Sequence, residues 1–110
     1  MQVGIDIQDI EPVKRFIGTN KMTRIFTASE LEYIAKKAHS PLTVAGMFCA
    51  KEAFFKALGT GIDIKKLLEV EIRHTPLGAP YYSNDPSAIL SISHTKTTAV
   101  AVCIIIRVSS

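Results

Sequence analysis

The stretch from Thr43 to Ile62 most constrains the fold, because its apolar residues follow the spacing of one long helix. It reads TVAGMFCAKEAFFKALGTGI. The larger apolar residues recur at steps of three and four, which is typical of a helix with one broad buried face. They are Val44, Met47, Phe48, Phe54, Phe55 and Leu58. Gly59 follows at once and can adopt the left-handed conformation that closes a helix. The pattern therefore predicts a buried helix that begins near Thr43 and ends at Gly59.

Three charged side chains interrupt this apolar helix. Glu52 and Lys56 stand one turn apart on one face, and Lys51 lies about 100° round the helix from Glu52. One interpretation is a solvated Glu–Lys pair that contributes a few tenths of a kcal/mol. The other follows from the apolar surroundings, where an ionised group needs a partner or water. A carboxylate flanked by ammonium groups suits a magnesium ion that is itself bound to phosphate oxygens. We therefore predict a metal and phosphate site on this helix.

The first residues alternate between apolar and polar, which predicts a strand over Gln2 to Ile10 with one buried face. The apolar set, expected to be buried, is Val3, Ile5 and Ile7. Asp6 lies on the opposite face, where an aspartate can simply face solvent. If the strand lies beside the Glu52 helix, Asp6 is instead a second carboxylate of a cation site, because two close carboxylates are costly without a cation between them.

A basic stretch follows Asp9, where Pro12 fits the first turn of a helix that Gly18 ends. Four positive side chains project from this part of the chain: Lys14, Arg15, Lys21 and Arg24. Two interpretations stay open. The charges form either a solvated face or a dock for an acidic protein surface, since complementary charge raises association rates and fixes orientation.

The segment Thr27 to His39 predicts a second helix, because Thr27 stands three residues before Glu30, as in a capping box. Glu30 is expected to be the reciprocal cap. The expected buried stripe consists of Leu31, Ile34, Ala35 and Ala38. Ser40 and Pro41 are expected to separate this helix from the central one.

The second half of the chain predicts strands. After a short helical turn, Val70 and Ile72 are expected to point inward from a strand, and Tyr81 to Tyr82 is extended after a tight connection. Two further strands are expected at Ile89 to Ser93 and Thr98 to Val108. The last is nearly continuous β-branched sequence and should be central and buried. The order of elements predicts one α+β domain over residues 1–110, with helices packed on a largely antiparallel sheet.

Composition limits the class of protein. The 110 residues are 47% hydrophobic and 21% charged, as in an ordinary soluble globular protein. The formal charge of +3 favours an acidic partner. The sequence has no dense stripe of basic residues with interleaved aromatics, so it gives no reason to expect nucleic acid as that partner. The sequence has no long uncharged apolar segment of the kind that signals secretion or a membrane span, so we expect a cytoplasmic protein. Cys49 and Cys103 are expected to be buried free thiols, without metal-site spacing.

Three motifs together resemble a known family. They are GIDIQDI at residues 4–10, FCAKEAFFKALGTGI at 48–62 and LSISHT at 90–95, supported by FTASELEY at 26–33 and LGAPY at 77–81. In this order and spacing the chain resembles, over nearly its whole length, the holo-acyl-carrier-protein synthase type of 4′-phosphopantetheinyl transferase. The resemblance implies that family's fold and a magnesium-dependent transfer of the phosphopantetheine arm of coenzyme A to a serine of apo acyl carrier protein. The products would be holo acyl carrier protein and adenosine 3′,5′-bisphosphate, in fatty acid biosynthesis.

The resemblance also implies roles for individual residues. Asp6 and Glu52 would coordinate Mg2+ that bridges the coenzyme A pyrophosphate, with Lys51 and Lys56 offsetting charge on the phosphates. The other coenzyme A contacts implied are His94, Thr95 and the backbone of Gly59, Thr60 and Gly61. His94 could also be a structural residue that closes a hairpin, and Gly59 a helix cap. The base for the serine proton stays open between Glu52, acting directly or through metal-bound water, and a metal-activated water near Asp6.

One position departs from the family pattern. Members commonly have arginine where this chain has Met47, so coenzyme A affinity is expected to fall unless Lys65 or Lys66 supplies the charge. The resemblance places the acidic carrier protein on the Lys14–Arg24 stretch and implies a homotrimer with active sites at subunit boundaries. Two rival hypotheses are a non-catalytic carrier or nucleotide-binding module and a basic nucleic-acid-binding domain. The presence of both Asp6 and Glu52 argues against the first, and the missing basic stripe against the second.

Overall fold

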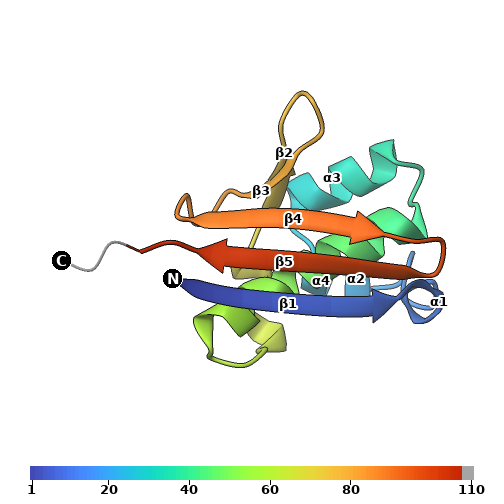
Figure 1. Ribbon diagram of the computed structural model, residues 1–110. Coiled ribbons are helices and arrows are strands. Elements are labelled where there is room, and N and C mark those ends of the chain that lie inside the picture. Colours follow the sequence, from blue (N-terminus) through green and yellow to red (C-terminus); the bar gives the residue numbers. More distant parts are fainter. Residues whose placement is uncertain (108–110) are drawn as a thin grey trace.

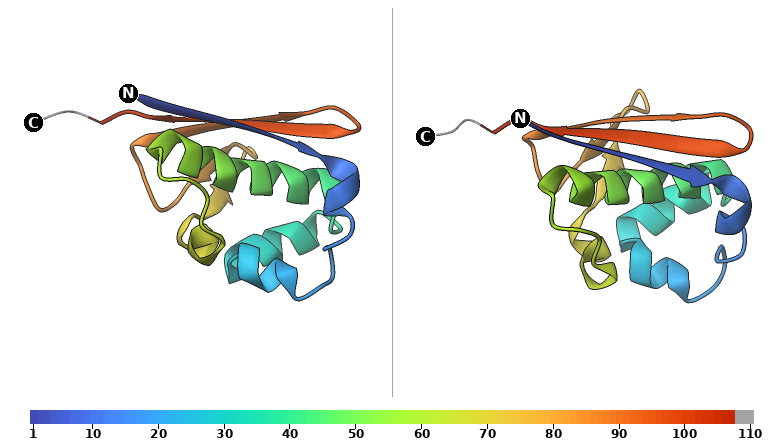
Figure 2. Two further views of the ribbon diagram at one scale, coloured as in Figure 1. Left: turned by 90° about the horizontal axis from the view of Figure 1, so that it is seen from below. Right: turned by 60° about the horizontal axis from the view of Figure 1, so that its bottom comes forward.

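The structure, a computed structural model, describes residues 1–107. Along the chain the elements are β1 (Gln2–Asp9), α1 (Ile10–Val13), α2 (Lys21–Ile25), α3 (Ala28–Lys36), α4 (Pro41–Leu58), the 3-10 helix η1 (Ile64–Glu69), β2 (Ile72–His74), β3 (Pro80–Tyr82), β4 (Ala88–His94) and β5 (Thr98–Ile105) (Figure 1). All helices lie on one side of the main sheet (Figure 2). The predicted α+β class is confirmed.

The main sheet has three antiparallel strands in the order β1-β5-β4, and β2 pairs with β3 in a separate hairpin. The last strand is central, as its β-branched sequence predicts, but it is not buried throughout: only every second side chain is buried, because the helices cover one face of the sheet. Its predicted end at Val108 lies outside the described residues. Strand pairing sets Asp6 opposite Ala101 and sets both Gln8 and His94 opposite Ala99.

Helix α4 lies under β1 and β5 and forms the centre of the core. It begins at Pro41, two residues before the predicted start, because proline suits the first helical turn, where its missing N–H needs no partner. It ends as predicted, with Gly59 in the left-handed region at φ 74°. Both Cys49 and Cys103 are buried free thiols, as expected.

The prediction for the faces of β1 is wrong. Val3, Ile5 and Ile7 are 64%, 61% and 66% exposed, while Gly4 and Asp6 face α4 and are buried. The reason is the close approach of strand and helix, since a Cβ on Gly4 would lie 2.1 Å from the Ala53 carbonyl oxygen. Alternation identified the two faces of the strand, but the glycine decides which face the helix can cover.

The apolar side of β1 continues across the sheet. Val3, Ile5 and Ile7 stand opposite Ile104, Val102 and Val100, and Ile89 stands on the other side of Ile104. We call this surface the open sheet face: Val3, Ile5, Ile7, Ile89, Val100, Val102 and Ile104. No element within residues 1–107 covers it (Figure 2). Such a large contiguous apolar surface is typical of an interface.

Two predictions about the first helices need correction. Helix α1 spans only four residues and is followed by turns up to Gly18, after which α2 is a separate helix. In α3 the capping box of Thr27 and Glu30 is confirmed. Of the predicted apolar stripe, however, only Ile34 is fully buried, and Ala35 and Ala38 are exposed. The described part of the chain has no helix long and apolar enough to cross a membrane.

Candidate functional site

Two acidic side chains predicted to act together are brought together between β1 and α4. Asp6 is 6% exposed. It forms an ion pair with Lys56, whose Nζ donates a hydrogen bond to Asp6 Oδ1 at 3.0 Å. Gln8 Nε2 donates to Asp6 Oδ2 at 3.3 Å and to Glu52 Oε2 at 3.0 Å. The close packing at Gly4 makes this cluster possible, because it holds the strand directly against the helix that carries Glu52 and Lys56.

The two carboxyl groups titrate as a pair. Burial, a hydrogen bond with Asp6 and the charge of Asp6 raise the pKa of Glu52 to about 7. Burial also acts to raise the pKa of Asp6, but hydrogen bonds from Glu52, Lys56 and Gln8 hold it below its ordinary value. In the metal-free protein the pair therefore holds one proton up to about neutral pH, and Glu52 carries it.

Lys56 is the cation of this cluster. Its side chain is about half exposed, and the hydrogen bond and charge of Asp6 raise its pKa. The ammonium group therefore stays charged and stands at the solvent side of the carboxylates, where an anionic ligand can reach it. This position agrees with the predicted role of Lys56 beside phosphate oxygens.

The assignment of Lys51 to phosphate is wrong, because Lys51 is fully buried. Its Nζ lies 2.7 Å from Glu30 Oε1 and donates to the carbonyls of Leu67 at 2.9 Å and Val70 at 2.6 Å. These three contacts use all the protons of the ammonium group. Lys51 therefore ties α4 to α3 and η1 and cannot touch a ligand.

Glu30 completes this buried connection. One of its oxygens accepts from the backbone N–H of Thr27, and the other from that of Ile72 at 2.8 Å. Glu30 is the expected helix cap, and it also anchors β2 and neutralises Lys51. The capping spacing predicted the first role, but the other two depend on residues far away in the sequence.

The oxygen ligands of the Asp6–Glu52 cluster fit a hard divalent cation. Mg2+ takes one or two protein carboxylates and completes its shell with water and phosphate oxygens. Within residues 1–107, no three His, Cys, Asp or Glu side chains gather closely enough to hold a metal. Asp6 and Glu52 can therefore hold Mg2+ only together with ligands of another kind.

His94 lies on the other flank of α4. Gly46 of α4 faces Ile92 of β4, whereas Glu52 and Lys56 face β1. On the β4 side, Gly46, Met47, Ile92 and His94 line a cavity of about 240 Å³. Met47 is buried in its wall and supplies no charge. His94 and the carboxylates are thus separated by the helix within one chain.

The glycine turn occupies a third position. Gly59, Thr60 and Gly61 are exposed at the C-terminal end of α4, beyond Ala57, which packs on Gly4. His94 and Thr95 lie near the opposite end of the sheet, at the level where Cys49 contacts Ala99. The predicted coenzyme A residues therefore do not converge within a single chain. Lys65 and Lys66, considered as substitutes for the family's arginine, are exposed on η1.

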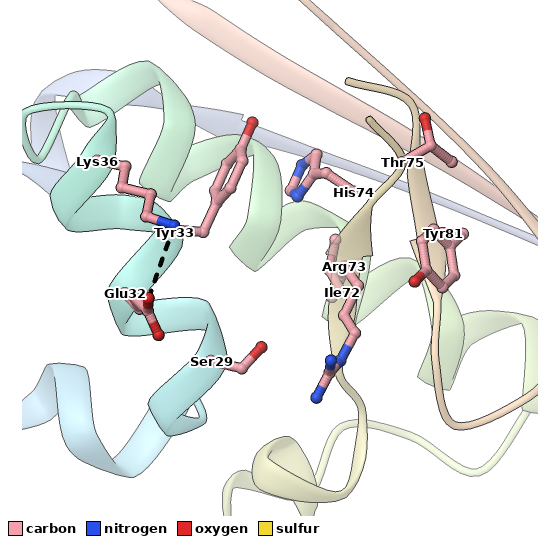
Figure 3. A pocket seen from close by; sticks show the side chains of 9 residues that line it. All are labelled: Ser29, Glu32, Tyr33, Lys36, Ile72, Arg73, His74, Thr75 and Tyr81. Carbon is pink, nitrogen blue, oxygen red and sulfur yellow. Dashed lines mark ion pairs between the residues drawn. The ribbon is translucent and has the colours of Figure 1, made fainter. Parts of the chain in front are cut away.

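A larger cavity, of about 390 Å³, lies between α3 and the β2–β3 hairpin (Figure 3). Tyr33 and His74 stack at 3.7 Å between ring centroids and line both this cavity and the one beside Met47. The Lys36–Glu32 pair stands at its side, and none of the Asp6 cluster lines it. The stack was not predicted, because Tyr33 was read only as the last residue of the FTASELEY motif and His74 belongs to no quoted motif.

Gln8 was also missed by the sequence analysis. One signal could have found it: residues two apart on a strand face the same side, so Gln8 must accompany Asp6. The four predicted docking residues Lys14, Arg15, Lys21 and Arg24 are all exposed, and Lys14 pairs with Glu11 at 3.0 Å. Lys14 also lines a cavity of about 260 Å³ with Ile10 and Leu42.

Comparisons with known proteins agree on one family. The model of the 4′-phosphopantetheinyl transferase superfamily matches residues 2–104. The holo-acyl-carrier-protein synthase of Alkaliphilus oremlandii is 40% identical over 94% of this chain and 97% of its own. The Bacillus anthracis synthase, solved in complex with CoA (3′,5′-ADP), is 35% identical, with 94% of each chain covered and a TM-score of 0.82. The Helicobacter pylori synthase, solved with coenzyme A, is 32% identical over 94% of this chain and 98% of its own, with a TM-score of 0.78.

Proposed function

The chain belongs to the holo-acyl-carrier-protein synthases of the 4′-phosphopantetheinyl transferase superfamily, and we propose that it transfers phosphopantetheine from coenzyme A to a serine of apo acyl carrier protein. The products are holo acyl carrier protein and adenosine 3′,5′-bisphosphate. We expect the reaction to serve fatty acid biosynthesis in the cytoplasm. One observation carries the proposal: Asp6 and Glu52 share a small polar space beside the Lys56 ammonium group.

The chemistry asks the protein mainly to place two reactants and to offset negative charge. Asp6 and Glu52 would hold Mg2+, which neutralises charge on the pyrophosphate when bound. Lys56 stands at the solvent side of Asp6 and offsets charge on the phosphate oxygens as adenosine 3′,5′-bisphosphate leaves. The serine attacks the phosphorus atom that carries the pantetheine arm, and the bond from that phosphorus to the nucleotide breaks.

Glu52 is the candidate acceptor for the serine proton. Its carboxyl group is half-buried beside Asp6, and its pKa is about 7 in the metal-free protein. A cation held by Glu52 would lower this pKa, so the proton would pass to Glu52 directly or through a metal-bound water. Asp6, whose pKa is lowered, stays ionised and keeps its place as a ligand and as the partner of Lys56.

We include in this proposal a homotrimer whose active sites lie at subunit boundaries. Its first support is the open sheet face, whose aliphatic side chains have no cover within one chain. Its second support is the separation of the Asp6 flank from the His94 flank by α4. A neighbouring copy that brings its His94 and Thr95 beside Asp6 and Glu52 would complete the coenzyme A site.

The carrier protein is expected to dock on the basic stretch, where all four side chains are exposed. Reversing Lys14 and Arg24 to Glu should raise the Michaelis constant for the carrier at least several-fold and leave coenzyme A binding intact, because rim charges steer encounter. The matched control is Lys36→Glu on α3, another exposed lysine. An unchanged carrier constant in the double variant would remove the dock from this surface.

Mass spectrometry tests the transfer directly. Apo acyl carrier protein is incubated with this protein, coenzyme A and Mg2+, and the carrier should gain the mass of one phosphopantetheine. Parallel reactions with Glu52→Gln or with EDTA should leave the carrier unchanged. If several carriers gain no mass although the protein binds coenzyme A, the transferase proposal fails and a binding module is the better description.

A further inference from the structure

Gln8 occupies the space between the two carboxylates that the proposed function assigns to Mg2+. Its single amide nitrogen donates to Asp6 Oδ2 at 3.3 Å and to Glu52 Oε2 at 3.0 Å. Both N–H groups of the amide are therefore used, one toward each carboxylate. The side chain is half-buried on the strand face that packs on α4, so it has little freedom to leave the cluster.

A cation between the carboxylates would place positive charge where the Gln8 amide otherwise faces negative charge. In the metal-free protein the carboxylates need donors, and the N–H groups supply them. A divalent ion in the same place repels N–H hydrogens and attracts an amide oxygen, which is an accepted ligand for hard cations. The two ends of an amide are nearly identical in shape, so half a turn about the last side-chain bond exchanges Nε2 for Oε1 without new space.

We propose that Gln8 is a third protein ligand of the cation, donating Nε2–H to Asp6 and Glu52 without metal and turning Oε1 to the metal when it binds. This inference rests on the proposed magnesium site. Within the described residues the cluster contains only two carboxylates. Gln8, two residues after Asp6 on the same strand, would add its amide oxygen as a third ligand. Gln8 also has a task in the metal-free protein, where its N–H groups hold both carboxylates in place.

The neutral charge of Gln8 matters for the reaction. Asp6 and Glu52 balance the two positive charges of Mg2+, and a neutral third ligand leaves the ion able to attract a phosphate oxygen. A carboxylate at this position would tighten the metal and repel the anionic nucleotide. Gln8→Glu is therefore expected to bind metal at least as tightly as the wild type and coenzyme A more weakly.

Mn2+ binding measured by electron paramagnetic resonance, without carrier protein and with coenzyme A present, tests the ligand role. Gln8→Leu and Gln8→Asn should each weaken Mn2+ binding about tenfold, as the loss of a ligand or its orienting partner does at other metal sites. The asparagine variant keeps a polar amide but is one methylene too short to reach the ion. Gln2→Leu is the matched control, since Gln2 is exposed on the same strand and should bind Mn2+ as the wild type does.

Nuclear magnetic resonance of the Gln8 side-chain amide separates a ligand from a donor that only positions the carboxylates. Saturating Mg2+ should shift the Gln8 carbonyl carbon and free its N–H protons from their carboxylate partners. If wild type and both Gln8 variants bind Mn2+ equally, or the N–H protons stay bonded to carboxylates under saturating Mg2+, Gln8 is not a ligand and the transferase proposal stands. If wild type binds no Mn2+ at all, the Asp6–Glu52 metal site falls, and the Gln8 ligand with it.

Discussion

The shared proton of the Asp6–Glu52 pair makes stability depend on pH in a direction that Glu52→Gln should abolish. Burial and the proximity of Asp6 raise the pKa of Glu52 from 4.5 to about 7 in the folded, metal-free protein. A raised pKa stabilises the fold fully below the unfolded value of 4.5, and this stability is lost as the pH rises through 7. At ~1.4 kcal/mol per pKa unit the full effect would be about 3 kcal/mol, and partial exposure reduces it to about 1–2 kcal/mol.

Glutamine is neutral at every pH and keeps a donor for Asp6, so Glu52→Gln should not lose this stability. In EDTA, the unfolding free energy of the variant relative to wild type should rise by about 1–2 kcal/mol between pH 4.5 and 8. Urea denaturation at fixed protein concentration measures it, and other titrating groups cancel in the difference. Glu69→Gln, on the exposed face of η1, is the control and should leave the difference flat. Parallel curves for wild type and Glu52→Gln would show that the carboxylates do not share a proton.

Three further predictions concern the buried Lys51, the close approach of β1 to α4, and the open sheet face. Lys51→Met should lower the free energy of unfolding, measured by urea denaturation, by about 3–5 kcal/mol, because it leaves the buried carboxylate of Glu30 unpaired. The coenzyme A affinity of the folded fraction should stay unchanged, and a large loss of affinity would restore the phosphate role of Lys51. Gly4→Ala should lower the free energy of unfolding by about 3 kcal/mol or more, because its Cβ would meet the backbone of α4. Gly46→Ala should be nearly neutral, because its Cβ would meet only the Ile92 side chain, at 3.1 Å. Equal losses in the two variants would contradict the close approach of β1 to α4. Ile5→Asp on the open sheet face should convert trimer to folded monomer in size-exclusion chromatography, and an unchanged elution volume would place the interface elsewhere.

Features that depend on neighbouring residues were predictable from the sequence. The course of α4, its stop at Gly59 and the capping box of α3 each follow from residues within one or two turns. The central place of β5 followed from its nearly continuous β-branched run, which favours a strand paired with a neighbour on each edge. These predictions need no knowledge of what packs on what.

The faces of β1 and the fate of Lys51 could not be predicted in the same way. An apolar stripe can be covered by the chain's own helix or stay exposed in the single chain, and Val3, Ile5 and Ile7 stay exposed. Similarly, a lysine in an apolar helix can reach a ligand or a buried carboxylate, and the partner of Lys51 lies twenty-one residues earlier in the sequence. The same reasoning about charges in an apolar helix singled out both Glu52 and Lys51, and it could not tell the carboxylate of the cluster from the lysine of the core.

The glycine that decides the buried face of β1 also explains how the site arises. Gly4 has no Cβ, so β1 can lie on the backbone of α4 at Ala53 and Ala57. Two residues farther along the same strand face, Asp6 is therefore pressed toward Glu52, one residue before Ala53 on the helix. Two carboxylates held this close need a proton or a cation between them. A small residue in the strand thus brings two negative charges together. The N–H groups of Gln8 and a proton stabilise this arrangement in the metal-free protein, and the proposed metal ion would replace the proton while Gln8 turns its oxygen inward.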